Sequence, residues 1–203
     1  VRLHYFDSLG RAETCRLILK YIGLEFEDVR YTQETASQGK AMAEFAQLPL
    51  LEIDGHSLVE SKAIEKYLLR RAGLISSDLF ENYQSESLAG FLQDLYETAV
   101  SFNVPVRNEE GFEKWLNEQL PGKLGLVEKR LNANNTHLVG DSVSHADFVT
   151  FEFLYDWLLR PLKAPTMRQI VERGAPRLIE FVENFKSHPN LAAYLATREE
   201  KAH

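Results

Sequence analysis

Residue types that often carry chemistry are few and scattered in this 203-residue chain. Its six histidines show neither an H-x-x-x-H repeat nor a pairing with cysteine, so we expect no metal site. The single cysteine, Cys15, lies on the apolar stripe of a predicted helix, and we expect a buried thiol rather than a nucleophile. No glycine-rich phosphate loop occurs. The remaining candidates are hydroxyl and charged side chains near the ends of predicted strands and helices.

The stretch YFDSLGR, residues 5–11, places candidate groups where a predicted strand gives way to a helix. Tyr5 alternates with Val1 and Leu3 in the opening VRLHYF, a pattern that by itself favours a strand aromatic on one face of a sheet. Arg11 follows where the helix begins. A helix N-terminus carries partial positive charge, so this corner of the chain favours a bound anion.

The stretch QLPLLEIDGHSLVES, residues 47–61, is typical of a hairpin but has a proline at its head. Asp54-Gly55 is a turn pair characteristic of two-residue hairpins, with apolar residues before it and HSLV after it. Pro49 removes a backbone donor and fixes φ where the first strand begins. We expect Ser61 to be the N-cap of the helix that follows, KAIEKYLLRRAG.

These candidates need two kinds of scaffold. The pattern predicts β-α-β-(α)-β-β-α over residues 1–73, a thioredoxin-like α/β order, although the absence of C-x-x-C excludes dithiol exchange. A linker is expected at 74–79, and only helical patterns occupy 80–203, which predicts an all-helical bundle domain. Within it, Ser144 and Asp147 form an S-x-x-D capping box before an apolar, central helix.

Composition narrows the classes of partner. The net charge of −7 and pI of about 5.4 argue against nucleic acid and anionic membranes as partners. No apolar run approaches the roughly 18 residues of a membrane span. The chain opens on a strand-like pattern rather than a signal peptide, and a lone cysteine suits a reducing compartment, so we expect a cytoplasmic location.

Four stretches together resemble the cytosolic glutathione transferase superfamily in its tyrosine-type classes, sigma being favoured and pi close. The resemblance covers essentially the whole chain and implies a thioredoxin-like domain followed by a helical one, a homodimer, and glutathione as co-substrate without a metal. The stretches that carry it are YF…GRAE at 5–13, QLPLLEIDG at 47–55, ESKAI at 60–64 and LVGDSVSHAD at 138–147.

The function that the resemblance implies is conjugation of the glutathione thiolate to small hydrophobic electrophiles. Two alternatives remain open: glutathione-dependent isomerisation or peroxide reduction of the sigma type, and a non-catalytic ligand-binding or structural member of the same fold. Non-catalytic members tend to lose the donor to sulfur or the contacts to glutathione, and the matching residues are present here. The sequence therefore favours an enzyme.

The resemblance gives Tyr5 the role of catalytic hydrogen-bond donor to the glutathione sulfur, with Ser8 as the rival hydroxyl. Arg11 is implied to contact glutathione and to support a positive field. Pro49 is implied to be cis, which turns the Leu48 backbone outward to pair with the extended glutathione peptide.

The γ-glutamyl end of glutathione is implied to lie at Ser61 and Glu60. The Ser61 hydroxyl and N–H suit a carboxylate, and Glu60 suits an ammonium, although the tyrosine classes usually have glutamine there. Asp94 matches an acidic residue that the pi and sigma classes send across a dimer interface to the same ammonium, so the active unit is expected to be a dimer.

The glycine end is implied to lie at Gln47 and Lys40, where lysine would act as a mobile point charge. The family often has a tryptophan where this chain has Glu34, which places one contact in doubt. The side of the site that receives the electrophile should be apolar. The candidates for that hydrophobic wall are Phe6, Leu9, Val100 and Val104.

Overall fold

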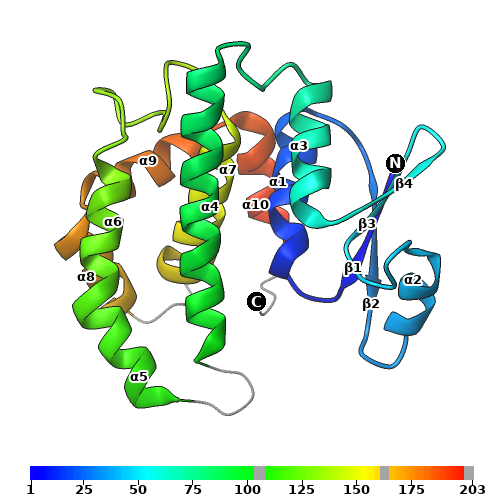
Figure 1. Cartoon of the computed structure of the whole chain (residues 1–203), viewed down its shortest axis with the longest axis horizontal. Helices are drawn as coiled ribbons and strands as arrows, with labels where there is room; N and C mark the ends of the chain where they lie inside the picture. The colour runs from blue at the N-terminus through cyan, green and yellow to red at the C-terminus, as the bar shows by residue number, and fades with distance from the viewer. Residues whose placement is uncertain (103–107, 161–164, 199–203) are drawn as a thin grey trace. The chain divides into compact units, whose positions relative to one another are not determined.

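Two compact units make up the chain in this computed structural model (Figure 1). The first unit comprises Val1–Ile75 together with the segment that begins at His188, and the second comprises Ser76–Ser187. The expected helical domain ran to the end of the chain, whereas this division groups the C-terminal segment with the α/β part. The structure describes residues 1–102, 108–160 and 165–198.

A four-stranded mixed sheet forms the centre of the first unit. Its strands are β1 (Arg2–Phe6), β2 (Glu27–Tyr31), β3 (Leu50–Ile53) and β4 (His56–Val59). They lie in the order β2-β1-β3-β4, with β1 parallel to β2 and the other pairs antiparallel. Leu3 and His4 of β1 are both buried although they point to opposite faces, so the sheet is covered on both sides.

Helices cover both faces of this sheet. They are η1 (Gly10–Ala12), α1 (Glu13–Tyr21), α2 (Ala36–Met42), α3 (Ser61–Arg71) and α10 (Pro189–Thr197). In Figure 1, α1 and α3 lie on one side of the sheet and α2 on the other, and α10 lies against α1. The element order confirms the predicted thioredoxin-like fold, and α2 forms where the sequence left a weak helix or a loop open.

The hairpin turn also forms as predicted. Asp54 and Gly55 both have positive φ, at 52° and 79°, which is the left-handed backbone that a two-residue hairpin turn needs. The β3–β4 register pairs Ile53 with His56 across this turn. Gly23 and Gly73 also have positive φ, and each follows the end of a helix.

Within its described residues the second unit contains helices and connecting loops but no strand, as predicted. Its helix α7 (His145–Leu154) has all ten residues buried, which makes it the central helix of the unit. The capping box at its start is confirmed, because Asp147 accepts hydrogen bonds from both the backbone N–H and the hydroxyl of Ser144. The helices are α4 (Leu79–Ser101), α5 (Glu109–Lys114), η2 (Trp115–Gln119), α6 (Leu120–Glu128), α7 (His145–Leu154), η3 (Tyr155–Leu159), α8 (Pro165–Gly174) and α9 (Arg177–Lys186).

The residues around Pro121 form three consecutive helical segments. They are α5, the π-helical η2 and α6, and Pro121 occupies the first turn of α6. Proline is tolerated there because a first-turn N–H has no partner within its own helix. Among the helices of the described ranges, none is long and apolar enough to cross a membrane.

Candidate active site

A cavity of about 450 Å³ opens in the first unit, and its lining comes from separate stretches of the sequence. Every lining residue is one that the sequence analysis named as a candidate, so the fold brings these candidates together. The residues that line the cavity are Tyr5, Phe6, Arg11, Lys40, Gln47, Leu48, Pro49, Glu60 and Ser61.

Tyr5 stands at the carboxyl end of β1 with 8% of its surface exposed. Its hydroxyl oxygen accepts a hydrogen bond of 3.1 Å from the backbone N–H of Arg11, which leaves the phenolic proton available to another acceptor. Burial raises the pKa of Tyr5 above its ordinary value, opposed by the Arg11 N–H and the charges of Arg11 and Arg16. The phenol is therefore neutral at physiological pH and can donate a hydrogen bond to an anion.

Gly10 is a residue of this site that the sequence analysis missed. It has a φ of +46°, and a Cβ at this position would lie 2.7 Å from the Tyr5 hydroxyl oxygen and 2.9 Å from the ring. Only glycine fits both the backbone conformation and the close approach. Gly10 therefore sets how near the loop comes to the Tyr5 side chain, and the GR pair at positions 10 and 11 was the available signal.

The Leu48–Pro49 peptide bond is cis, as predicted. Pairing between β3 and β1 begins at Leu50, so Leu48 precedes the paired part of the strand. Both Leu48 and Pro49 line the cavity. Leu48 thus lies in the cavity lining just before the paired part of β3, a position where an extended ligand could add to the strand.

The start of α3 differs from the prediction in one respect. Ser61 is not the N-cap, because the helix begins at Ser61 and Glu60 occupies the N-cap position without a capping side-chain bond. Glu60 has a φ of +69°, a conformation that non-glycine residues seldom adopt. The Ser61 hydroxyl therefore does not cap the helix. Ser61 lies at the positive end of α3 and lines the cavity.

Cys15 lies behind this helix start rather than in the cavity. Its thiol is fully buried and donates to the backbone carbonyl of Ser61 at 3.8 Å. Burial raises the pKa of the Cys15 thiol well above its ordinary value, so the thiolate is disfavoured. The predicted burial of Cys15 is confirmed.

The charges around the cavity have both signs. Arg11 and Lys40 are cationic and Glu60 is anionic. The ammonium of Lys40 lies 5.6 Å from the centre of the Phe6 ring, and Phe6 itself packs edge-on against Tyr5 at 5.4 Å. The lining therefore suits a ligand that carries carboxylates together with an ammonium group, and it offers an aromatic surface near the Tyr5 hydroxyl.

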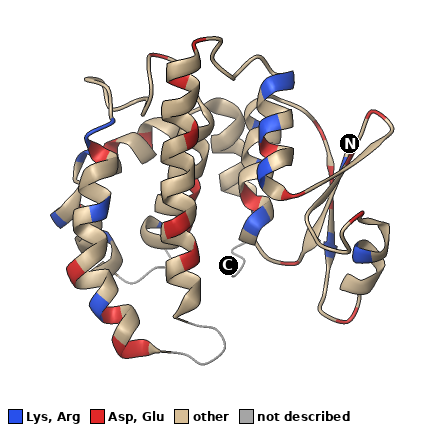
Figure 2. Cartoon of the chain, in the orientation of Figure 1, with Lys and Arg blue, Asp and Glu red and all other residues tan. Residues whose placement is uncertain are grey.

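Among the described residues, three that the sequence analysis predicted do not belong to this lining. Leu9, expected on the hydrophobic wall, is fully buried and so cannot face a ligand. Asp94 and Val100 lie on α4 in the second unit, and Val104 lies outside the described residues. All charges on α4 are acidic, as Figure 2 shows, and Asp94 is one of its exposed residues. The rival hydroxyl, Ser8, is likewise absent from the lining.

Metal ligation has no counterpart in the parts of the chain that the structure describes. Within residues 1–102, 108–160 and 165–198, no group of three or more His, Cys, Asp or Glu side chains is placed to hold a metal ion.

Comparison with known proteins agrees with this geometry over both units. The family model described as "Glutathione S-transferase, N-terminal domain" matches residues 1–70, and the model described as "Glutathione S-transferase, C-terminal domain" matches residues 93–198. Glutathione S-transferase 1 of Ascaris suum is 34% identical, and the alignment covers 97% of this chain and 96% of the relative.

The chain is also similar to two further proteins with different names. The structure of a Pi-class glutathione S-transferase from Onchocerca volvulus has a TM-score of 0.83 and 26% identity, covering 97% of this chain and 92% of that one. Hematopoietic prostaglandin D synthase of Gallus gallus is 28% identical, covering 99% of this chain and 98% of the relative. With both domain models matched in order and a relative above 30% identity along nearly its full length, the chain belongs to the glutathione S-transferase family.

Proposed function

We propose that this protein conjugates the thiolate of glutathione to small hydrophobic electrophiles, with Tyr5 as the donor that stabilises the thiolate. The observation that carries the proposal is the joint lining of one cavity by a neutral Tyr5 phenol, the Leu48 backbone and the Ser61 helix start. Glutathione is a tripeptide with two carboxylates, one ammonium and one thiol. The cavity presents groups that match each of these.

The proposed binding mode follows from the charges. The γ-glutamyl carboxylate binds the hydroxyl and N–H of Ser61, and the ammonium faces Glu60. The cysteinyl backbone pairs with Leu48 beside Pro49. The glycyl carboxylate lies toward Lys40 and Gln47. This arrangement directs the thiol toward Tyr5 and Arg11, and it uses the helix N-terminus for an anion.

The chemistry is nucleophilic substitution or addition by sulfur. The free thiol has a pKa of about 8.5, so little thiolate is present at neutral pH in water. A hydrogen bond from the Tyr5 hydroxyl favours the charged form, and the thiol proton leaves to solvent. The thiolate then forms a carbon–sulfur bond with the electrophile as its leaving group departs, and the site contributes proximity.

Binding to immobilised glutathione, followed by turnover of a chromogenic electrophile, tests this function. We expect retention on the resin and measurable conjugation. We expect Tyr5→Phe to be retained but to lose about 10²-fold or more in kcat/KM, the scale of removing one oriented donor. No binding to glutathione at all would contradict the enzymatic role, and unchanged turnover in Tyr5→Phe would contradict the assignment of the donor.

Glutathione-dependent isomerisation is the second candidate. It is favoured by the similarity to the Gallus gallus protein named hematopoietic prostaglandin D synthase, at 28% identity over 99% of this chain. Isomerisation would use the same thiolate and the same donor, Tyr5. The two functions separate in an assay that compares an electrophile with a prostaglandin endoperoxide at equal enzyme concentration. The preferred substrate is the one with the larger kcat/KM.

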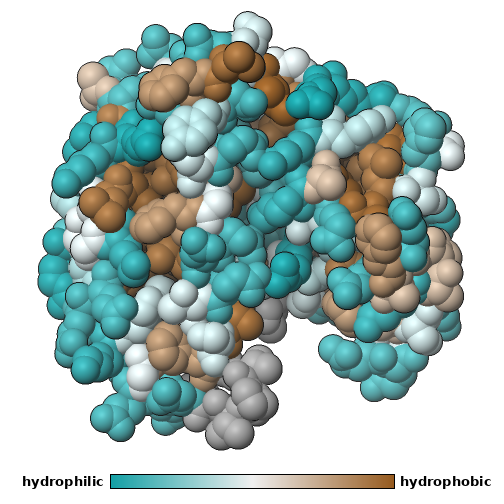
Figure 3. Space-filling view, in the orientation of Figure 1, coloured by the Kyte–Doolittle hydropathy of each residue, from teal (hydrophilic) through white to brown (hydrophobic). Residues whose placement is uncertain are grey.

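We propose that the protein acts as a homodimer. The start of α4 exposes three large apolar side chains, and brown and tan residues gather at that end of the helix in Figure 3. Apolar side chains grouped on a surface favour association. Asp94 lies on the same helix, and we propose that it completes the partner's site. The exposed side chains are Leu79, Phe80 and Tyr83.

A further inference from the structure

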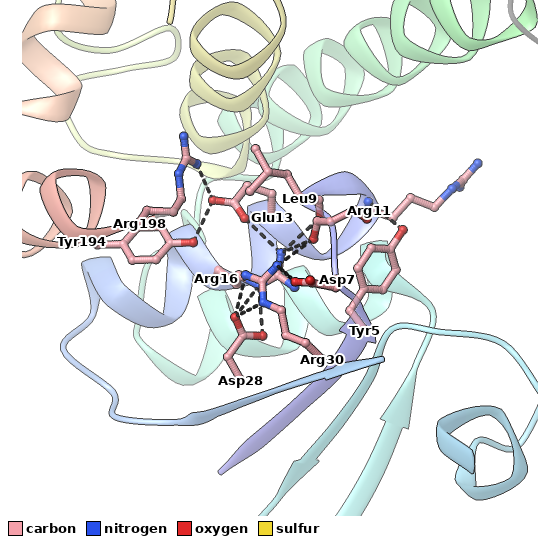
Figure 4. A network of polar contacts seen from close by, with 11 residues as sticks. Tyr5, Asp7, Leu9, Arg11, Glu13, Arg16, Asp28, Arg30, Tyr194 and Arg198 are labelled. Atoms are coloured by element: carbon pink, nitrogen blue, oxygen red, sulfur yellow. Dashed lines mark hydrogen bonds and ion pairs between the residues drawn. The ribbon is translucent and has the colours of Figure 1, made fainter. Parts of the chain in front are cut away.

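A buried group of charged side chains surrounds the loop that follows Tyr5 (Figure 4). Glu13 and Arg16 of α1 are both fully buried, and the side chain of Arg198 is only 4% exposed. Charges are costly to remove from water unless they are well paired. The contacts of these three side chains show which parts of the structure they hold in place.

The C-terminal segment supplies one end of this network. The hydroxyl of Tyr194, on α10, donates to Oε1 of Glu13 at 2.9 Å. Nη1 of Arg198, directly after α10, donates to the same oxygen at 2.6 Å. The guanidinium of Arg198 also lies 5.7 Å from the centre of the Tyr194 ring. Two side chains at the end of the chain thus converge on a single oxygen of α1.

Arg16 connects Glu13 to the loop. Its Nη1 donates to Oε2 of Glu13 at 3.0 Å, and to the backbone carbonyls of Ser8 and Leu9 at 3.2 and 3.1 Å. The Ser8 carbonyl also accepts from Nη1 of Arg30, at 3.0 Å. The backbone of the loop is therefore held from behind by two guanidinium groups.

A second anchor keeps those guanidinium groups in place. Asp28, on β2, accepts from Nε of Arg16 through both of its carboxylate oxygens, each at 3.1 Å. It also pairs with Nη2 of Arg30 at 2.7 Å. Arg30 reaches Asp7 as well, at 3.8 Å. The charged groups around the loop are thus Glu13, Arg16, Asp28 and Arg30, together with Asp7 of the loop itself.

The loop in turn sets the geometry of the site. Ser8 and Leu9 lie between Tyr5 and Arg11, and the Arg11 N–H is the group that holds the Tyr5 hydroxyl. The guanidinium of Arg16 itself lies 5.8 Å from the centre of the Tyr5 ring. A shift of the two carbonyls would move the Arg11 N–H and so reorient the phenol.

We propose that α10 is a positioning element of the active site, which acts through Glu13 and Arg16 on the loop that carries Tyr5 and Arg11. Tyr194 and Arg198 are its positioning residues. The inference rests on the proposed role of Tyr5, since it concerns how that side chain is oriented. The charge states agree with it: burial alone would raise the pKa of Glu13, but Arg16 and Arg198 lower it, so the carboxylate stays ionised at neutral pH.

Tyr194→Phe tests the proposal with little risk to folding, because it removes one hydroxyl and keeps the ring. Arg198→Gln removes the charge, and Arg198→Lys restores it. We expect Tyr194→Phe and Arg198→Gln to lower kcat/KM by about 5- to 30-fold and to move the acidic limb of its pH profile upward by about half a pH unit or more. The KM for glutathione should change less than about twofold, since the binding residues are untouched.

The matched control is Arg168→Gln, which removes an exposed arginine paired with Glu172 on α8 and should leave the pH profile unchanged. Hydrogen exchange at the Arg11 amide gives a readout that does not depend on activity, and it should accelerate in Tyr194→Phe. The proposal is overturned if folded Tyr194→Phe and Arg198→Gln keep the wild-type pH profile, or if Arg198→Lys fails to restore it. If Tyr5→Phe also leaves the profile unchanged, the proposed function fails rather than the positioning role.

Discussion

The Tyr5 phenol meets two requirements of a donor to a thiolate, because it keeps its proton and its hydroxyl is oriented. Burial keeps its pKa high, and the Arg11 N–H occupies its oxygen. Gly10 determines how closely the loop can approach. The orientation of the Tyr5 hydroxyl therefore depends on contacts of about 3 Å, which changes of a few atoms can disturb.

Replacing Gly10 by alanine should therefore harm activity more than stability. The new methyl would meet the Tyr5 hydroxyl at 2.7 Å, and the end of that side chain can move away, which misplaces the donor. The positive φ adds about 1 kcal/mol of destabilisation. We expect a loss of kcat/KM of about tenfold or more, measured beside the thermal unfolding midpoint.

Gly73→Ala is the control for that substitution. It has a similar positive φ of +71°, but an added Cβ would meet nothing within 4 Å. Its destabilisation should match that of Gly10→Ala while kcat/KM stays near wild type. Equal losses of activity in the two variants would mean that backbone strain, not the contact with Tyr5, controls the site.

At the scale of elements, the starts of two helices place site residues at the cavity. The N-terminus of α3 presents Ser61 to the cavity, and η1 presents Arg11. The network behind the loop binds α10 to α1 and α1 to the loop. These elements are far apart in sequence, so the site depends on their packing as much as on the residues themselves.

Ser61→Ala separates a binding role from a capping role. An N-cap substitution would cost about 1 kcal/mol of stability, whereas Ser61 is the first helical residue and its loss should cost less. The lost hydrogen bond to a carboxylate should raise the KM for glutathione about tenfold with little change in kcat. Ser57→Ala on β4 is the control. A Ser61→Ala variant that loses stability but keeps the wild-type KM for glutathione would contradict the binding role.

Acid should weaken the docking of α10. The pKa of Glu13 is lowered in the folded state, so its contribution to stability is present above its ordinary value of 4.5 and is lost as the pH falls through the folded-state pKa. In Arg198→Gln one of the two positive charges that lower the pKa of Glu13 is removed, so this pKa rises. The loss of stability on acidification should therefore begin at higher pH. The urea midpoint as a function of pH measures this. Curves of the same shape for wild type and Arg198→Gln would contradict it.

At the scale of the whole molecule, the sequence predicted the residues that line the cavity better than the buried residues that hold the loop after Tyr5. The nine cavity residues could be predicted because the family resemblance, carried by several short stretches in order, assigns them roles. The role of Arg16 could not be predicted, because the sequence alone does not distinguish a buried arginine in a helix from an exposed one until its partners on distant elements are known. The attachment of α10 to the first unit was missed for the same reason.

Assembly is the other property of the whole molecule. If the start of α4 forms the dimer interface, Phe80→Glu should convert the dimer to a monomer, because it buries a charge in an apolar contact. Light scattering after gel filtration measures the mass. Leu126→Glu, at an apolar residue of α6 that is also exposed, should remain dimeric. A wild-type protein that elutes as a monomer, or a Phe80→Glu variant that stays dimeric, would contradict the proposal.

The most direct test is the ionisation of glutathione bound to the protein, followed by the ultraviolet absorbance of the thiolate as the pH is raised. We predict that the bound thiol in the wild type titrates well below the value of about 8.5 for a free thiol, and that Tyr5→Phe returns it toward that value while glutathione still binds. The same titration curve in wild type and Tyr5→Phe would contradict the central claim that the Tyr5 hydroxyl stabilises the thiolate.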